Sequence, residues 1–85
     1  MPVAQEFRGR FRFPGTYAFL EMPSHDFALL QFDDPYTGKF DKLEAENTCN
    51  TLKAAHQDGD PAILTGAMVN CDVNGRPTPV LFLFD

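Results

Sequence analysis

Several features that would identify a function are scarce or missing in this sequence of 85 residues. There is no Trp, only one Ser and only two Cys. No apolar run approaches the ~20 residues that a membrane-spanning helix needs. The first residues have neither the basic region nor the apolar stretch of a signal peptide. We therefore expect a cytoplasmic protein that does not contact a membrane.

No group of residues in the sequence specifies a reaction. Ser24, His25 and Asp26 are consecutive, and neighbouring side chains on an extended segment point in opposite directions, so they cannot form a catalytic relay. Cys49 and His56 share one face of the expected helix but lie about 10 Å apart along its axis. That distance prevents a thiolate–imidazole pair. We expect no enzyme and no catalytic residue.

Metal and cofactor motifs are also missing. Structural zinc sites use four Cys or His ligands in close-spaced pairs, whereas this chain has two of each and none close together. Asp58-Gly59-Asp60 lacks the rest of a calcium loop, and there is no glycine-rich phosphate loop. We expect no cofactor and no metal site. In a reducing cytoplasm we expect Cys49 and Cys71 to be free, buried thiols.

The composition is that of one globular domain spanning residues 1–85. Hydrophobic residues make up 44% of the chain, charged residues 22%, and nine Phe indicate a core built from aromatic rings. The net charge of −5 and the pI of about 4.7 argue against duplex DNA or an anionic membrane as the partner. They are compatible with a basic protein partner.

The hydrophobic pattern predicts strands, one helix and short turns. Residues 5–13 alternate between Phe or Gly and polar residues, which is typical of a half-buried strand. Further strands are expected at residues 16–22, 26–33, 62–71 and 76–84, the first three strands being joined by connections of about two residues. Asn74-Gly75 is a strong hairpin signal between the last two strands.

A single helix is expected between the third and fourth strands. Asp41 suits the N-cap, and Glu44 completes a capping-box pattern. The helix should run to about Gln57, with Gly59 as its C-cap and Pro61 preventing continuation. Its apolar face is narrow and consists largely of small residues, which would let it lie close to a sheet.

The resulting order is β-β-β-α-β-β, an antiparallel α+β fold. Two architectures fit: a curved sheet with the helix across one face, or a small, partly open barrel with the helix plugging one end. The second is similar in element order alone to the oligonucleotide/oligosaccharide-binding fold. The apolar run from Val80 to Phe84 is expected at the centre of the sheet, with self-association as the alternative. The chain is therefore expected to be a monomer or a homodimer.

Basic charge is concentrated in the first strand. Residues 1–15 hold three Arg and one Glu, whereas residues 16–75 hold three Lys and ten acidic residues. The three arginines, Arg8, Arg10 and Arg12, share the polar face of that strand. We call this the arginine face.

Two interpretations of the arginine face are open. The guanidinium groups could pair with acids such as Glu21 or Asp33 on neighbouring strands. Alternatively, they could contact phosphate or carboxylate groups of a ligand, because Arg presents a planar fork that suits both. Tyr17 and Tyr36 could then provide stacking for the bases of a single strand.

Acidic residues are densest around the turn into the helix. Carboxylates near a helix N-terminus are favourable by about 0.3–1 kcal/mol each, which explains part of this density. The remainder suggests a docking surface for a basic partner. We therefore predict a small, acidic, non-catalytic protein that binds another macromolecule, most simply a protein, as an inhibitor, adaptor or small assembly subunit. The alternative is a single-stranded nucleic-acid-binding domain of the oligonucleotide-binding type. The candidate binding residues are Arg8, Arg10, Arg12, Tyr17, Asp33, Asp34, Tyr36 and Glu44.

Overall fold

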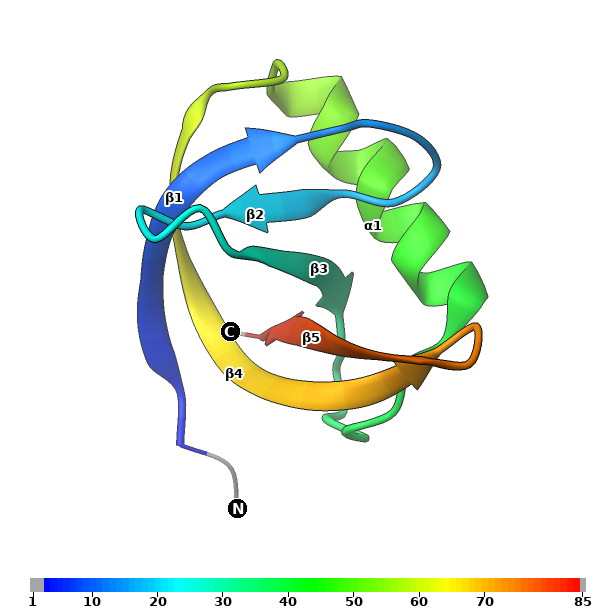
Figure 1. Cartoon of the computed structure of the whole chain (residues 1–85). Coiled ribbons are helices and arrows are strands. Elements are labelled where there is room, and N and C mark those ends of the chain that lie inside the picture. The colour runs from blue at the N-terminus through cyan, green and yellow to red at the C-terminus, as the bar shows by residue number, and fades with distance from the viewer. Residues whose placement is uncertain (1–2, 85) are drawn as a thin grey trace.

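The computed structural model describes residues 3–84 and is a closed barrel of five strands with one helix (Figure 1). The α+β prediction is confirmed, and the barrel replaces the curved sheet. The barrel is closed rather than partly open, with strand order β1-β2-β3-β5-β4. The elements are β1 (Gln5–Arg12), β2 (Phe19–Glu21), β3 (Phe27–Phe32), α1 (Lys42–Ala55), β4 (Pro61–Val73) and β5 (Arg76–Leu83).

One strand pair corrects the prediction of a wholly antiparallel sheet. β3 and β5 are parallel, while the other four pairs are antiparallel. The reason is the closure of the ring: with five strands, directions that alternate around a closed ring must coincide at one pair. The β1–β2–β3 meander and the β4–β5 hairpin fix that pair as β3 with β5.

The connection between β1 and β2 is longer than the sequence predicted. Residues 13–18 join β1 to β2, so β2 has three residues instead of the seven expected at residues 16–22. The chain leaves β1 because the Phe13 N–H donates to Asp58 Oδ1 at 2.9 Å, which draws this loop toward the end of the helix. The Asn74-Gly75 hairpin is confirmed, with φ of 53° and 82° at its two residues.

The helix α1 begins where the sequence predicted, but it ends earlier than predicted. Asp41 is the N-cap and accepts a hydrogen bond from the Glu44 N–H at 3.1 Å. The capping box is incomplete, because the Asp41 N–H donates to Gln31 Oε1 at 3.0 Å. His56 is the C-cap, so Gly59 as C-cap was wrong; with a φ of 91°, Gly59 forms the later turn into β4.

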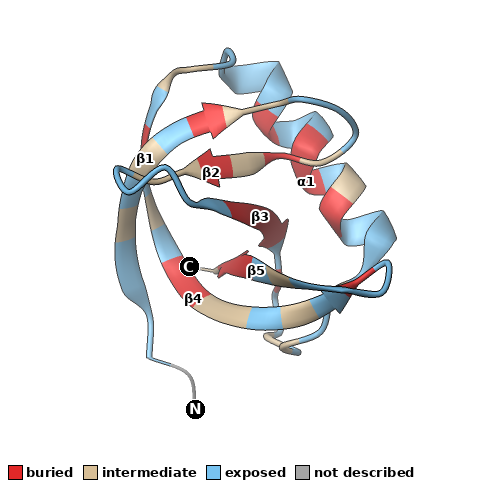
Figure 2. Ribbon diagram, in the orientation of Figure 1, coloured by how far each residue is buried: buried red, intermediate tan, exposed pale blue. Residues whose placement is uncertain are grey.

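Apolar side chains pack on both sides of the barrel wall. Figure 2 shows that every strand and α1 contain buried residues. The inner core fills the barrel and includes Cys49 and Leu52 of α1. A second group, here called the outer cluster, lies on the opposite face of β3 and β5. Its buried members are Leu29, Ala45, Val73, Val80 and Phe82. Because both faces of β5 are covered and β5 lies between β3 and β4, the predicted central position of this strand is confirmed.

The two cysteines are free thiols, as expected. Cys49 is buried as expected, whereas Cys71 is only half-buried, so the prediction of a buried thiol was wrong at Cys71. Burial raises the pKa of both thiols, because removal from water disfavours the thiolate. Within residues 3–84, no helix has the length and apolar character needed to cross a bilayer.

Candidate functional site

Arg12 is held by two carboxylates on the outside of the barrel. Its Nη1 lies 2.8 Å from Glu21 Oε1, and its Nε lies 3.2 Å from Asp58 Oδ1. The predicted pairing with Glu21 is confirmed, whereas Asp33 accepts hydrogen bonds from Thr37 instead. The hydrogen bond from Arg12 lowers the pKa of Glu21, and the Asp58 pKa is lowered first by the Phe13 N–H and then by Arg12. Arg12 therefore has a structural role.

These pairs predict an acid-dependent loss of stability. Because the pKa values of Glu21 and Asp58 are lower in the folded state, their contribution is present above the ordinary carboxyl pKa of about 4 and is lost as pH falls through the lowered values. We expect Arg12→Ala to flatten the fall in stability below about pH 4. Urea unfolding between pH 2 and pH 7 measures this. Arg8→Ala is the control, and an equal flattening in that variant would contradict the assignment.

Arg10 and Arg8 are held more loosely. Arg10 Nη1 donates to the carbonyl oxygen of Gly59 at 3.0 Å, and among the described residues no carboxylate forms an ion pair with it. Arg8 Nε lies 3.9 Å from Glu6 Oε1, and both side chains are mostly exposed. Such an exposed, long pair contributes little. Both guanidinium groups are therefore accessible to a ligand.

Two aromatic rings, Phe19 and Phe27, lie on the same side of the sheet as the arginine face. Arg12 pairs with Phe19, and Glu21 pairs with Phe27, and directly paired residues share a face. The Phe19 and Phe27 rings meet edge to face with centroids 6.4 Å apart. Phe27 is 45% exposed. These rings could stack on a base beside the arginines.

A shallow pocket of about 380 Å³ adjoins this side of the sheet. Arg8, Arg10 and Glu21 line it together with His25, which has a φ of 69° in the turn between β2 and β3. The His25 side chain is exposed, and its Nδ1 lies 3.5 Å from Glu21 Oε2. The pocket thus presents two guanidinium groups and an imidazole beside one carboxylate.

Tyr17 and Tyr36 are engaged with other aromatic rings. The Tyr17 ring meets Phe40 edge to face with centroids 5.8 Å apart. Tyr36 contacts Phe82 and Phe84 with centroids at 5.5 and 5.7 Å. Both tyrosines pack against the outer cluster, where they cover the wall formed by β3 and β5. Their geometry gives them a packing role.

The acidic candidates come together at the start of α1. Asp33, Asp34 and Glu44 line one hollow of about 230 Å³, together with Asp41, and we call it the acidic hollow. One carboxylate oxygen of Asp33 accepts hydrogen bonds from the N–H and the hydroxyl of Thr37, at 2.9 and 3.0 Å. Asp34 and Glu44 are exposed. The sequence therefore placed these three residues in one region correctly.

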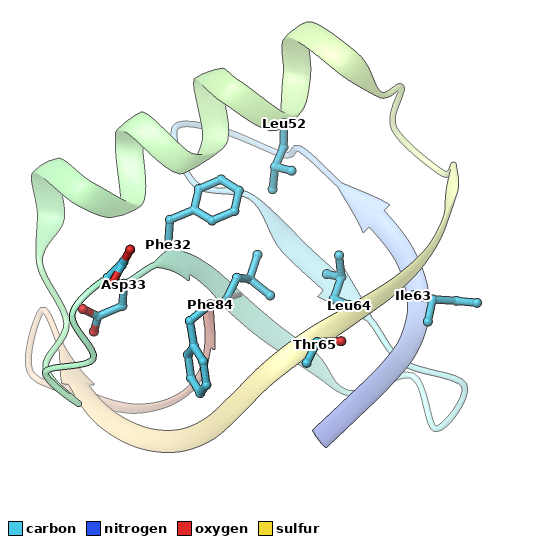
Figure 3. Close-up of a pocket in the computed structure, with 9 residues that line it drawn as sticks. Phe32, Asp33, Leu52, Ile63, Leu64, Thr65 and Phe84 are labelled. Atoms are coloured by element: carbon cyan, nitrogen blue, oxygen red, sulfur yellow. The ribbon is translucent and has the colours of Figure 1, made fainter. Parts of the chain in front are cut away.

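A groove of about 350 Å³ lies between α1 and β4 (Figure 3). In Figure 3, the helix runs along one side of the groove and β4 along the other, with Leu52 projecting from the helix into the space between them. Phe32 is 40% exposed and Ile63 is 59% exposed, although both are large apolar side chains. We call this space the α1–β4 groove. Its lining residues are Phe32, Asp33, Asp34, Leu52, Ile63, Leu64, Thr65, Leu83 and Phe84.

The groove and the acidic hollow are continuous. Phe32, Asp33 and Asp34 line both, so the apolar groove opens at one end onto carboxylates. The end of β3 is fixed against the helix because the Phe32 N–H donates to Thr48 Oγ1 at 2.8 Å. Thr48 also donates to the Glu44 carbonyl oxygen at 2.8 Å. These two hydrogen bonds therefore hold the end of β3 against α1 where the groove meets the acidic hollow.

In residues 3–84, no three His, Cys, Asp or Glu side chains are arranged to hold a metal ion. Comparison of the chain with protein-family models, curated proteins and solved structures found no match.

Proposed function

We propose that this chain is a non-catalytic binding domain that holds a basic, partly apolar segment of another protein. The segment occupies the α1–β4 groove and reaches into the acidic hollow. The observation that supports this most directly is the junction at Phe32, Asp33 and Asp34, where exposed apolar surface meets carboxylates. A ligand that fits this junction must combine apolar and basic groups.

The electrostatics of the hollow favour a cation. Four carboxyl groups line it, and the described part of its lining includes no Lys or Arg. Lys39 and Lys42 are near in sequence, but both are exposed and neither is part of the lining. The N-terminus of α1 adds roughly half a positive charge, which four carboxylates outweigh. The net charge of −5 adds long-range attraction for a basic partner.

The apolar groove supplies the larger part of the binding energy. Full burial of a Phe or Ile side chain is worth about 1.5–3 kcal/mol, and Phe32 and Ile63 each have about half of that still to gain. Exposed ion pairs contribute about 0.2–1 kcal/mol each. Apolar contact therefore sets the affinity, and the carboxylates select the partner and orient it.

A selection from a displayed library of random dodecapeptides tests this function. We expect peptides that bind the wild-type protein to be enriched in Lys or Arg beside apolar residues. The double variant Asp34→Asn/Glu44→Gln should bind them several-fold more weakly, with a smaller salt dependence. The control variant Glu6→Gln/Asp72→Asn removes the same charge from exposed positions outside the α1–β4 groove and the acidic hollow. It should bind the peptides normally. Enrichment of acidic peptides, or equal weakening in the two double variants, would rule the function out.

The arginine face supports a second candidate function, the binding of single-stranded nucleic acid. Phe19 and Phe27 lie beside Arg10 on the outside of β1, β2 and β3, in a barrel whose element order is shared with the oligonucleotide/oligosaccharide-binding fold. Aromatic stacking and guanidinium–phosphate contact are the two interactions that such a site needs.

Binding of fluorescent oligothymidylate at low salt tests the second candidate. Stacking contributes about 1–3 kcal/mol per base, so Phe27→Ala should weaken binding by about 5- to 150-fold. Leu43→Ala changes another exposed apolar residue, on α1, and should have no effect. Absence of binding at low salt, or equal loss in both variants, would eliminate this candidate.

A further inference from the structure

β4 has an unpaired edge beside the α1–β4 groove. This strand pairs with β1 over residues 61–66 and with β5 over residues 66–73. Among residues 3–84, residues 61–65 therefore have a strand neighbour on the β1 side alone. In a β-strand, the N–H and C=O groups of alternate residues point to opposite edges. Part of the backbone of residues 61–65 thus faces away from β1, toward the groove.

The groove continues the path that β5 follows along β4. β5 ends at Leu83, which is opposite Gly66 of β4 and beside Phe32 of β3. The next residue, Phe84, has its ring 5.7 Å from Tyr36 on the outer side of the barrel. On the side of residues 62–65 that faces away from β1, the described residues leave a groove of about 350 Å³ where a neighbouring strand would lie. An additional extended segment would fit in this space as a neighbour of β4.

The unpaired edge has little protection against a partner strand. Edges are usually blocked by charge, proline or a bulge. Residues 62–65 are Ala-Ile-Leu-Thr and hold no charge, and Ile63 is 59% exposed. Pro61 blocks only the first position, because proline has no N–H to donate. Residues 62–65 are thus open to backbone pairing.

We infer that an extended segment of a partner protein adds to β4 as an extra strand along residues 62–65. This inference rests on the proposed function and specifies how the segment is recognised. Four strand residues span about 13 Å, so four or five residues of the partner pair with the edge. The segment has apolar side chains along Ile63 and Leu64. It has a Lys or Arg at the end nearest Asp34, where the groove opens onto the acidic hollow.

Backbone N-methylation of a selected dodecapeptide tests the strand geometry. N-methylation removes an N–H donor and blocks close approach, and in an extended peptide alternate N–H groups face one edge. Two peptides are compared, one methylated at odd and one at even positions of the paired segment. We expect one of the two methylated peptides to lose about ten-fold or more in affinity and the other to keep nearly the affinity of the unmethylated peptide. Equal behaviour of the two series would overturn the inference.

The protein side is tested by amide hydrogen exchange and by one charge substitution. Bound peptide should slow exchange at alternate residues within 62–65. Ile63→Lys should weaken binding of the basic peptide by about ten-fold or more through like charge, whereas Leu43→Lys, an equally exposed position on α1, should not. Unchanged exchange at residues 62–65 would overturn strand addition.

The outcomes separate this inference from the proposed function. Peptide that binds, is weakened by Asp34→Asn/Glu44→Gln and tolerates both methylation series would retain the proposed function and exclude strand addition. No enriched peptide would exclude both. A wild-type dimer whose β4 edge is already protected from exchange would place a second copy there and overturn the peptide site. Light scattering of the free protein identifies that dimer.

Discussion

Replacing Gly66 with Ala is expected to remove more than half of the stability of this protein. A Cβ at Gly66 would overlap the Phe82 carbonyl oxygen and lie 2.9 Å from its carbonyl carbon. The atoms that would clash belong to the backbone of β5, whose residues Val80 to Leu83 are all buried. This backbone cannot move without disturbing the inner core and the outer cluster. Overpacking costs about 1–3 kcal/mol where side chains can adjust, and a backbone clash costs more.

The expected loss of about 3 kcal/mol or more is large against the total stability. Domains of this size lie near the low end of the range of about 5–15 kcal/mol. Urea unfolding followed by far-ultraviolet circular dichroism measures the difference. Gly15→Ala is the matched control, because nothing lies within 4 Å of a Cβ at Gly15. That variant should stay within about 0.5 kcal/mol of the wild type. Similar losses in both variants would contradict the strand contact at Gly66.

Gly66 also explains why the barrel can close. β4 pairs with β1 up to this residue and with β5 from it onward, so the strand changes neighbours there. Gly9 has the corresponding place in β1: its Cβ would overlap the Glu21 carbonyl oxygen of β2. Glycines at such bends let two strands approach closely. Close backbone approach, rather than positive φ, is what both positions require.

Local signals in the sequence predicted local structure well. The alternation in β1, the Asp41 cap and the Asn74-Gly75 turn depend on residues close together in the chain, and each is found in the structure. The short β2 was missed because its length depends on the Phe13–Asp58 hydrogen bond, which joins distant segments. The parallel pair was missed for a different reason, since it follows from ring closure and not from any sequence pattern.

The candidate sites also differ in whether local sequence signals could predict them. Asp33, Asp34 and Glu44 lie within one connection and its helix, so their proximity could be predicted. The α1–β4 groove draws on β3, α1, β4 and the C-terminal end of β5, and no local pattern links these segments. Phe27 faces outward because it pairs with Glu21, which pairs in turn with Arg10 of the arginine face. This register involves three strands, so no local pattern in the sequence predicts it.

Phe82→Ala is expected to destabilise the protein by about 3–5 kcal/mol, the usual cost of deleting a buried Phe side chain. Phe82 is fully buried, yet it lies in the outer cluster and not inside the barrel. Its cover is Tyr36, whose ring meets it edge to face at 5.5 Å. The prediction therefore tests whether the connection between β3 and α1 is packed onto the barrel wall in solution.

Phe27→Ala removes the same side chain from a position that is 45% exposed on the outside of the barrel. Its cost should be about 1 kcal/mol, because less apolar surface is lost and no closed cavity forms. Equal costs for the two variants would mean that the outer cluster does not form. A large cost at Phe82 alone would establish that β5 is buried on both faces. Both faces of β5 would then be occupied by the protein itself, while the edge of β4 at residues 62–65 would stay open to a partner.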